Sequence, residues 1–354
     1  MSKLFRYLAF KYFKNFIIIF AGLILFYVGF DYMQATKRLP DSANLRMLYI
    51  YYQAIFASDI LTPVAMIFGL IATKIVLIRT NELVALYAIG YTKAQILRPF
   101  IIVASIITII YMFAHNTKYA YAEEYVRSIY SHGKISRATE DLFFKYNNHY
   151  IYFATLYPIA QKATNIRIYH QVDDDIVEII QSEEAFYRDD KWFIPHAKKL
   201  IKQENINFNN PPMEIFKDGD IEILKGFKPA VLDHIHEGKV HYSIEDALTA
   251  IELLTAQNVS ADKVYSALYS MIIYPFFVPA LMIIIFFFVP ISSRALNISV
   301  FSFVAIITTL MVWGLLFAMT QLTHGGVFTP EAGIIFPVFL LILIATGVWI
   351  RKAH

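Results

Sequence analysis

Just beyond the ends of long apolar runs, the sequence places four basic residues, Lys37, Arg38, Lys118 and Arg127. Such side chains could bind phosphate groups, because guanidinium and ammonium groups pair strongly with phosphate oxygens. The same residues would also be found there if they only solvated the ends of membrane helices. The four residues by themselves leave both interpretations open.

A single carboxylate, Glu82, lies in a short polar segment between two apolar runs, residues 79–100 (RTNELVALYAIGYTKAQILRPF). Asn81 is a plausible N-cap, and Glu82 in the first turn would favour the positive end of the helix dipole. Gly90 is typical of a helix C-terminus, and Thr92 opens a capping-box pattern for the next helix. We therefore predict a short helix at the membrane surface. It is either a plain interfacial loop helix or an element that receives force from a separate motor protein.

Other chemistries find little support. The sequence has no cysteine and no GxxxxGK[ST], HExxH or GxSxG pattern, so we predict no catalytic residues. His234, His236 and His241 have a loose metal-like spacing, but we favour exposed histidines at a domain edge. The run 173–175 (DDD) lacks the glycine and terminal glutamate of an EF-hand, which favours a turn. We therefore predict neither a metal nor a cofactor.

The composition indicates an integral membrane protein. The chain has 354 residues, of which 57% are hydrophobic and 16% aromatic. This content of hydrophobic residues is too high for a typical soluble protein. The net charge of +3 is small for this length and gives no support to nucleic-acid binding.

Six apolar stretches are close to the length that spans a bilayer, which takes about 20 residues. They are predicted at about 16–33, 55–78, 99–114, 268–289, 298–318 and 334–350. Residues 1–15 carry four basic residues and no acid, and we expect an amphipathic segment along the cytoplasmic face. Arg79, Arg294 and Arg351 fall on the same side, so the positive-inside rule places both termini in the cytoplasm.

Two acids, Asp31 and Asp59, lie near the opposite ends of their spans. Ionisable groups in spans are costly and suggest function. Here they could equally be interfacial anchors or line a cavity.

Between the third and fourth spans, the chain becomes polar and β-like. Short alternating runs are separated by Asn, Asp, Gly and Pro, which suggests a small sandwich or jelly roll on the periplasmic side. Its inward-facing residues are predicted to be Tyr150, Tyr152, Ile166, Ile168, Trp192, Ile194, Ile221 and Ile223. We predict an α-helical membrane protein with six helices, three before and three after an inserted, periplasmic, all-β jelly-roll-like domain. Its parts are 1–120 with a coupling helix at 80–92, 121–260 with a connecting helix, and 261–354.

Four segments resemble one family. NELVALYAIGYTKAQI (81–96) resembles the ELVALRASG(V/Y)S coupling helix of the permease subunits of the lipopolysaccharide-export ABC transporter, the LptF/LptG family of YjgP/YjgQ-type permeases. Residues 243–276 and 325–344 resemble the family's entries to the fourth and last spans, although Met271 stands where the family often has lysine. FDYM (30–33) resembles LptG more than LptF.

The resemblance implies a non-catalytic permease of the bacterial inner membrane that extracts lipopolysaccharide and passes it to a periplasmic bridge. Its implied partners are a cytoplasmic LptB-like ATPase dimer, a paralogous LptF-like permease, and LptC-like and LptA-like bridge proteins. The implied ATPase-coupling residues are Glu82, Leu83, Leu86, Tyr87 and Gly90. The implied substrate-binding residues are Lys37, Arg38 and Arg127.

A rival interpretation is a membrane-anchored scaffold or sensor whose β domain binds a periplasmic protein. It too would need spans and an exposed domain. It would not need a short capped helix between the second and third spans, or an associated ATPase.

Overall fold

The computed structural model shows that the membrane helices and the β domain form separate units of this chain. It describes residues 3–133, 138–146, 149–158, 160–172, 175–202, 213–217, 219–237, 241–256, 258–288 and 298–352, and every structural statement below concerns these residues. Arg294, Asp173 and Asp174 lie outside them. The first unit is Met1–Val126 with Tyr265–His354, and the second is Arg127–Val264.

Six helical segments in the described chain are long and apolar enough to cross a membrane, which confirms the six predicted spans. In a bilayer, a helix satisfies its own backbone hydrogen bonds, so such apolar runs fold as helices. The segments are α1 (Lys3–Ala35), α2 (Ala43–Arg79), α4 (Lys93–Ala114), α8 (Asp262–Ile272) continued by η2 (Tyr274–Phe276) and α9 (Phe277–Phe288), α10 (Ile298–His324), and η3 (Glu331–Ile335) continued by α11 (Phe336–Lys352).

The start of α1 corrects one prediction. Residues 3–15 do not form a separate surface segment but are the first turns of the long helix α1. Leu8, Tyr12 and Phe16 follow one another at intervals of four and are all buried, so a single helix face packs inward across the predicted boundary. That shared face explains why the helix continues without a break.

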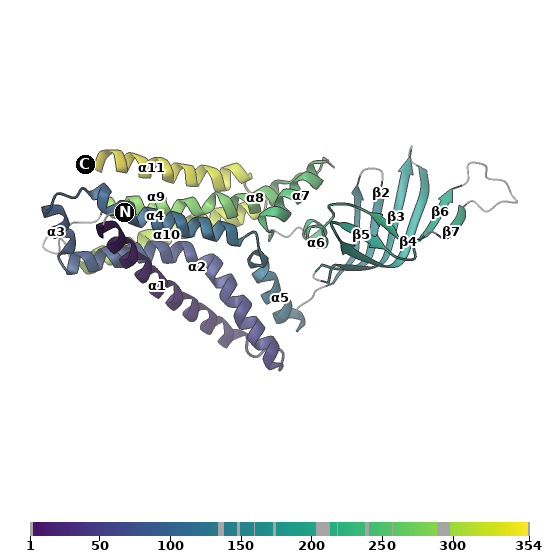
Figure 1. Ribbon diagram of the computed structural model, residues 1–354, viewed down its shortest axis with the longest axis horizontal. Helices are drawn as coiled ribbons and strands as arrows, with labels where there is room; N and C mark the ends of the chain where they lie inside the picture. Colours follow the sequence, from purple (N-terminus) through teal and green to yellow (C-terminus); the bar gives the residue numbers. More distant parts are fainter. Residues whose placement is uncertain are drawn as a thin grey trace. The chain divides into compact units, whose positions relative to one another are not determined.

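Helix α2 lies at the centre of the helical unit and contacts α1, α4, α9 and α10 (Figure 1). Gly69 lets α1 approach closely, because a Cβ atom at this position would lie 3.0 Å from the Cα of Phe16. Polar contacts fix the same crossing: Asn15 donates to the Thr73 hydroxyl at 2.9 Å, and the Tyr12 hydroxyl donates to the Met66 carbonyl at 3.1 Å. Small residues and interhelical hydrogen bonds are typical of packing inside membranes.

The second unit contains an antiparallel sheet of eight strands in the described residues, which confirms the inserted β domain. The long strand β4 pairs with β3 on one side and with β6 and β5 at different points along the other. The jelly-roll arrangement stays a prediction. The strands are β1 (Thr139–Tyr146), β2 (His149–Tyr157), β3 (Lys162–Val172), β4 (Asp175–Arg188), β5 (Lys191–Ile194), β6 (Lys198–Lys202), β7 (Met213–Lys217) and β8 (Ile221–Ile223).

The buried face of this sheet agrees with only part of the prediction. Ile166, Ile168, Trp192 and Ile194 are fully buried, as predicted, and the Trp192 indole N–H donates to a backbone carbonyl at 2.8 Å. The predicted phase of β2 is wrong at this point, because Ile151 and Phe153 are fully buried, whereas Tyr150 and Tyr152 are only half-buried. Ile221 and Ile223 are only half-buried.

The register explains the error in β2. Ile151 pairs with Ile168, and Phe153 pairs with Ile166, so the apolar residues of both strands share one face. Tyr152 then points to the other face, where its hydroxyl donates to the Asp141 carboxylate at 2.6 Å.

Short helices flank the sheet in the chain. η1 (Lys118–Tyr121) and α5 (Ala122–His132) follow α4. α6 (Pro229–Glu237) was not predicted, although Pro229 at its first position is a typical helix start. α7 (Ile244–Ala256) lies in the region where a connecting helix was predicted, and at its start the Asp246 backbone N–H donates to the Ser243 hydroxyl at 3.1 Å.

Candidate coupling site at helix α3

Helix α3 (Glu82–Ala88) connects α2 to α4 and lies at the same end of the helical unit as both chain termini (Figure 1). This matches the short helix predicted there. Asn81 takes the N-cap position but with a φ of 58°, and its side chain makes no cap hydrogen bond, so that part of the prediction is wrong. In this left-handed conformation, Asn81 turns the chain sharply out of α2, whereas a capping side chain needs extended backbone.

The end of α3 is fixed by Gly90, which has a φ of 97°. Its N–H donates to the Tyr87 carbonyl at 3.0 Å, and the Tyr91 N–H donates to the Leu86 carbonyl at 3.1 Å. This pair of bonds is a Schellman motif and favours glycine. The next helix opens with the predicted capping box of Thr92, so the chain turns back toward the membrane within a few residues.

The Glu82 carboxylate is bound within the chain. Lys11 on α1 donates to both of its oxygens at 2.7 and 2.8 Å, and the Tyr7 hydroxyl donates at 2.7 Å. The Thr80 hydroxyl donates at 2.8 Å. Burial alone would raise the pKa of the Glu82 carboxyl, but these hydrogen bonds outweigh burial and lower the pKa below its usual value. Glu82 therefore links α3 to the first turns of α1.

The apolar side chains of α3 divide into an inner and an outer face. Leu83 is fully buried in the core of the helical unit, and Leu86 and Tyr87 pack partly against the same core. Burial raises the pKa of the Tyr87 hydroxyl to about 12. Leu83 therefore cannot form part of a docking surface, which corrects the prediction for this residue, whereas docking through the half-buried Leu86 and Tyr87 stays a prediction. The outer face consists of Val84, Ala85, Ala88 and Ile89.

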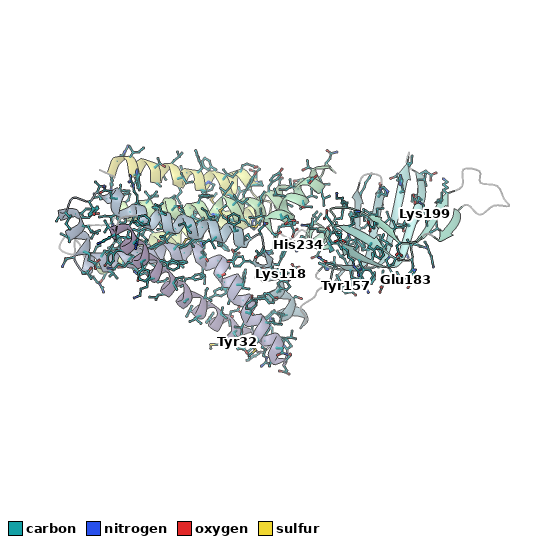
Figure 2. All side chains as sticks on the ribbon, viewed as in Figure 1. Tyr32, Lys118, Tyr157, Glu183, Lys199 and His234 are labelled. Atoms are coloured by element: carbon teal, nitrogen blue, oxygen red, sulfur yellow. The ribbon has the colours of Figure 1, made fainter. Side chains whose placement is uncertain are left out.

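The predicted substrate-binding cations fall in both units. Lys37 and Arg38 are exposed in the turn after α1, and Arg127, which is also exposed, lies on α5 and begins the second unit. Figure 2 labels Tyr32, near the end of α1, and Lys118, at the start of η1. Whether the three cations form one group stays a prediction.

Both intramembrane acids are bound by tyrosines of neighbouring helices. Tyr49 donates to Asp31 at 2.6 Å, and Tyr111 donates to Asp59 at 2.6 Å. The Nε2 atom of His115, which is buried, lies 3.0 Å from the same Asp59 oxygen. Sequence analysis singled out both acids but missed His115, because its partner lies 56 residues away in the sequence. The structure shows anchoring contacts, and the cavity-lining role is not tested.

The predicted character of one histidine is wrong. His234 was expected to be exposed, but it is only 1% exposed on α6, and its ring lies 5.1 Å from that of Tyr242. The packing of α6 against β1, β2 and α7 explains this, since four consecutive residues, Val231 to His234, are all buried. The side chain of His236 lies outside the described set.

These features define a multi-pass membrane protein with six apolar helices, a capped helix between the second and third, and an inserted antiparallel β domain. A family model agrees over nearly the whole chain. The chain belongs to the lipopolysaccharide export system permease LptF/LptG family, whose model matches residues 6–352. The family is a transporter permease, and the resemblance in the sequence is thereby confirmed. The choice between LptF-like and LptG-like stays a prediction. A search of curated proteins returned no match.

Proposed function

We propose that this chain is one permease subunit of an ABC transporter that extracts lipopolysaccharide from the bacterial inner membrane and passes it to a periplasmic bridge. The observation that carries the proposal is α3, a short helix with a tightly defined end, placed between two membrane helices of a chain from this permease family. The β domain would lie in the periplasm and hand the lipid to LptC-like and LptA-like proteins.

The ATPase would be a separate LptB-like dimer, because the sequence contains no Walker A pattern. The side chains that reach outward from α3 are apolar or small, with Ile89 75% exposed and Val84 39% exposed. Exposed apolar residues gathered on one short helix are typical of a docking surface. Ile89 and Val84 would contact the ATPase, while Glu82 and Leu83 hold α3 in place from behind.

A second, LptF-like permease would complete the translocation pathway. Within the most apolar 18 residues of each span, 67% of the residues are buried in α2, but only 11% in α1 and 22% in α10. The large apolar residues of α1 include Phe10, Leu25 and Phe26, all well exposed. These surfaces are free to contact lipid tails, the second permease or the acyl chains of the substrate.

Lys37, Arg38 and Arg127 would bind the phosphates of the lipid, and photocrosslinkers at these positions should capture lipopolysaccharide.

The test is co-purification of the ATPase with α3 variants of the full chain. Ile89→Asp should insert normally yet lose most of the ATPase, since it places a charge in the apolar contact. Val259→Asp is the matched control, because Val259 is also an exposed apolar residue (51%) but lies in the loop before α8. If Ile89→Asp retains the ATPase and supports export, α3 is a plain interfacial loop helix. The scaffold or sensor function would then be favoured.

A further inference from the structure

A row of polar side chains crosses one end of the β sheet. His149 on β2 lies directly opposite His170 on β3, and His170 lies opposite Glu178 on β4. Residues directly opposite one another on neighbouring strands point to the same face. Two positions further along each strand, that face buries Ile151, Ile168 and Ile180. The polar row therefore marks the end of the sheet's apolar inner face.

The two imidazoles are close enough to act together. Their ring centroids are 4.5 Å apart, the ring planes are inclined by 63°, and both residues are half-buried. Burial and, to a smaller extent, the neighbouring His170 lower the pKa of His149 below its usual value. Neutral imidazoles are the commonest protein ligands of transition-metal ions.

A carboxylate lies one strand further along the row. Glu178 is bound by Lys199 of β6, with 2.7 Å between the Oε1 and Nζ atoms. Lys199 is labelled in Figure 2 on the β domain. This ion pair is partly exposed, so it contributes little to stability and can exchange for another cation at small cost. Glu178 thus offers a carboxylate oxygen as a possible third ligand atom next to the histidine pair.

We propose that His149 and His170 form a binding site for a divalent transition-metal ion such as Zn²⁺, with Glu178 as third ligand once it leaves Lys199. Two imidazoles and a carboxylate suit zinc, copper or nickel, whereas calcium and magnesium prefer oxygen ligands. The bound ion would tie β2, β3 and β4 together at the end of the apolar face. The site does not depend on the proposed export function.

The test is zinc titration calorimetry of the full chain in detergent, without a histidine tag. One Zn²⁺ per chain should bind saturably. His149→Ala and His170→Ala should each weaken zinc binding by at least about tenfold. Even residues that only hydrogen-bond to the metal ligands commonly contribute that much to metal affinity. His196→Ala is the matched control, because His196 is an exposed histidine of the same domain, in the turn between β5 and β6. With Cu²⁺, electron paramagnetic resonance should show coupling to two imidazole nitrogens.

Two further variants test the third ligand. Glu178→Gln should weaken zinc binding, and Lys199→Met should strengthen it by freeing the carboxylate. His170→Gln, which keeps a similar volume and polarity, replaces His170→Ala if the latter lowers the thermal midpoint without zinc. Absence of saturable binding, or equal loss of binding in His196→Ala, would overturn the site. Unchanged affinity in both Glu178→Gln and Lys199→Met would remove Glu178 from it.

Discussion

Two carboxylates join neighbouring helices of the membrane unit, and they differ in the surroundings of their partners. Glu82 binds Lys11, whose side chain is 19% exposed and lies near the chain's N-terminus. Asp59 binds Tyr111 and His115, and the His115 side chain is only 6% exposed. If Glu82 is lost, Lys11 can turn to water, but if Asp59 is lost, His115 stays enclosed. The cost of breaking such a contact therefore depends on whether the surviving group can be solvated.

The largest expected loss of stability comes from a fully buried aromatic residue. It sets the scale against which the two carboxylate contacts are compared. Trp192→Ala should lower the free energy of unfolding of the β domain by about 3–5 kcal/mol, as is typical when a buried tryptophan is truncated. The indole packs 4.9 Å from the Phe153 ring and donates its N–H to Phe227. Hydrogen exchange of the β strands in the full chain measures the loss. Ile176→Ala, at an exposed position on β4, should change little, and equal effects would show that the assigned core is wrong.

The next largest effect should come from Asp59. Asp59→Leu leaves the Tyr111 hydroxyl and the His115 ring without their acceptor, and an unpaired buried donor costs about 1–3 kcal/mol. The thermal midpoint of the detergent-solubilised protein should fall accordingly. Asp41→Leu is the matched control, because Asp41 is fully exposed and its partner Arg46, 2.9 Å away, can turn to water. A similar fall in both variants would mean that partner burial does not decide the cost.

A smaller effect should follow from pH at Glu82. Its pKa is lower in the folded protein than in the unfolded chain, so the carboxylate stabilises the fold above the unfolded-state pKa of about 4.3. This stability is lost as pH falls through the lower folded-state pKa. The contribution of a partly exposed pair is about 0–1 kcal/mol. Thermal midpoints between pH 7 and pH 3 should therefore fall slightly less in Glu82→Gln than in the wild type. An identical pH dependence would indicate that the contact with Lys11 is not maintained in solution.

Sequence analysis predicted the helices well and the contacts between them poorly. Each span is an apolar run whose helical state is imposed by the bilayer, and Gly90 and Thr92 are local signals that need no distant partner. Lys11 and Glu82 are 71 positions apart, so no local pattern reveals their contact. Leu83 was assigned to the outer face of α3 for the same reason, since only tertiary packing shows that it is buried.

The β domain shows the same limit within one strand. In HYIYFATLY, both alternating sets of residues contain large apolar or aromatic side chains, so the pattern alone cannot select the inner face. The partner strand makes the selection, because Ile166 and Ile168 of β3 pair with Phe153 and Ile151. Tyrosines tolerate the outer face, where their hydroxyls can reach polar groups such as Asp141. To predict which residues of such a strand face inward, one must know how the strand pairs with its neighbour as well as its own sequence.

An exchange of charges between Glu82 and Lys11, with little expected change in stability, separates two roles of Glu82 in coupling. If Glu82 only positions α3 through Lys11, then exchanging the two charges should preserve its role. Glu82→Lys places two cations together and should lose the ATPase on purification, although folding changes by only about 1 kcal/mol or less. The double variant Lys11→Glu with Glu82→Lys restores opposite charges, and we expect it to recover most of the bound ATPase.

A direct contact between Glu82 and a cation of the ATPase predicts the reverse, because a lysine there repels that cation whatever residue 11 is. Both variants and Lys11→Glu alone form a double-mutant cycle, and the coupling between the two positions is what the cycle measures. Failure of the double variant to recover the ATPase, with normal membrane insertion, would show that the carboxylate acts on the partner and not on α1.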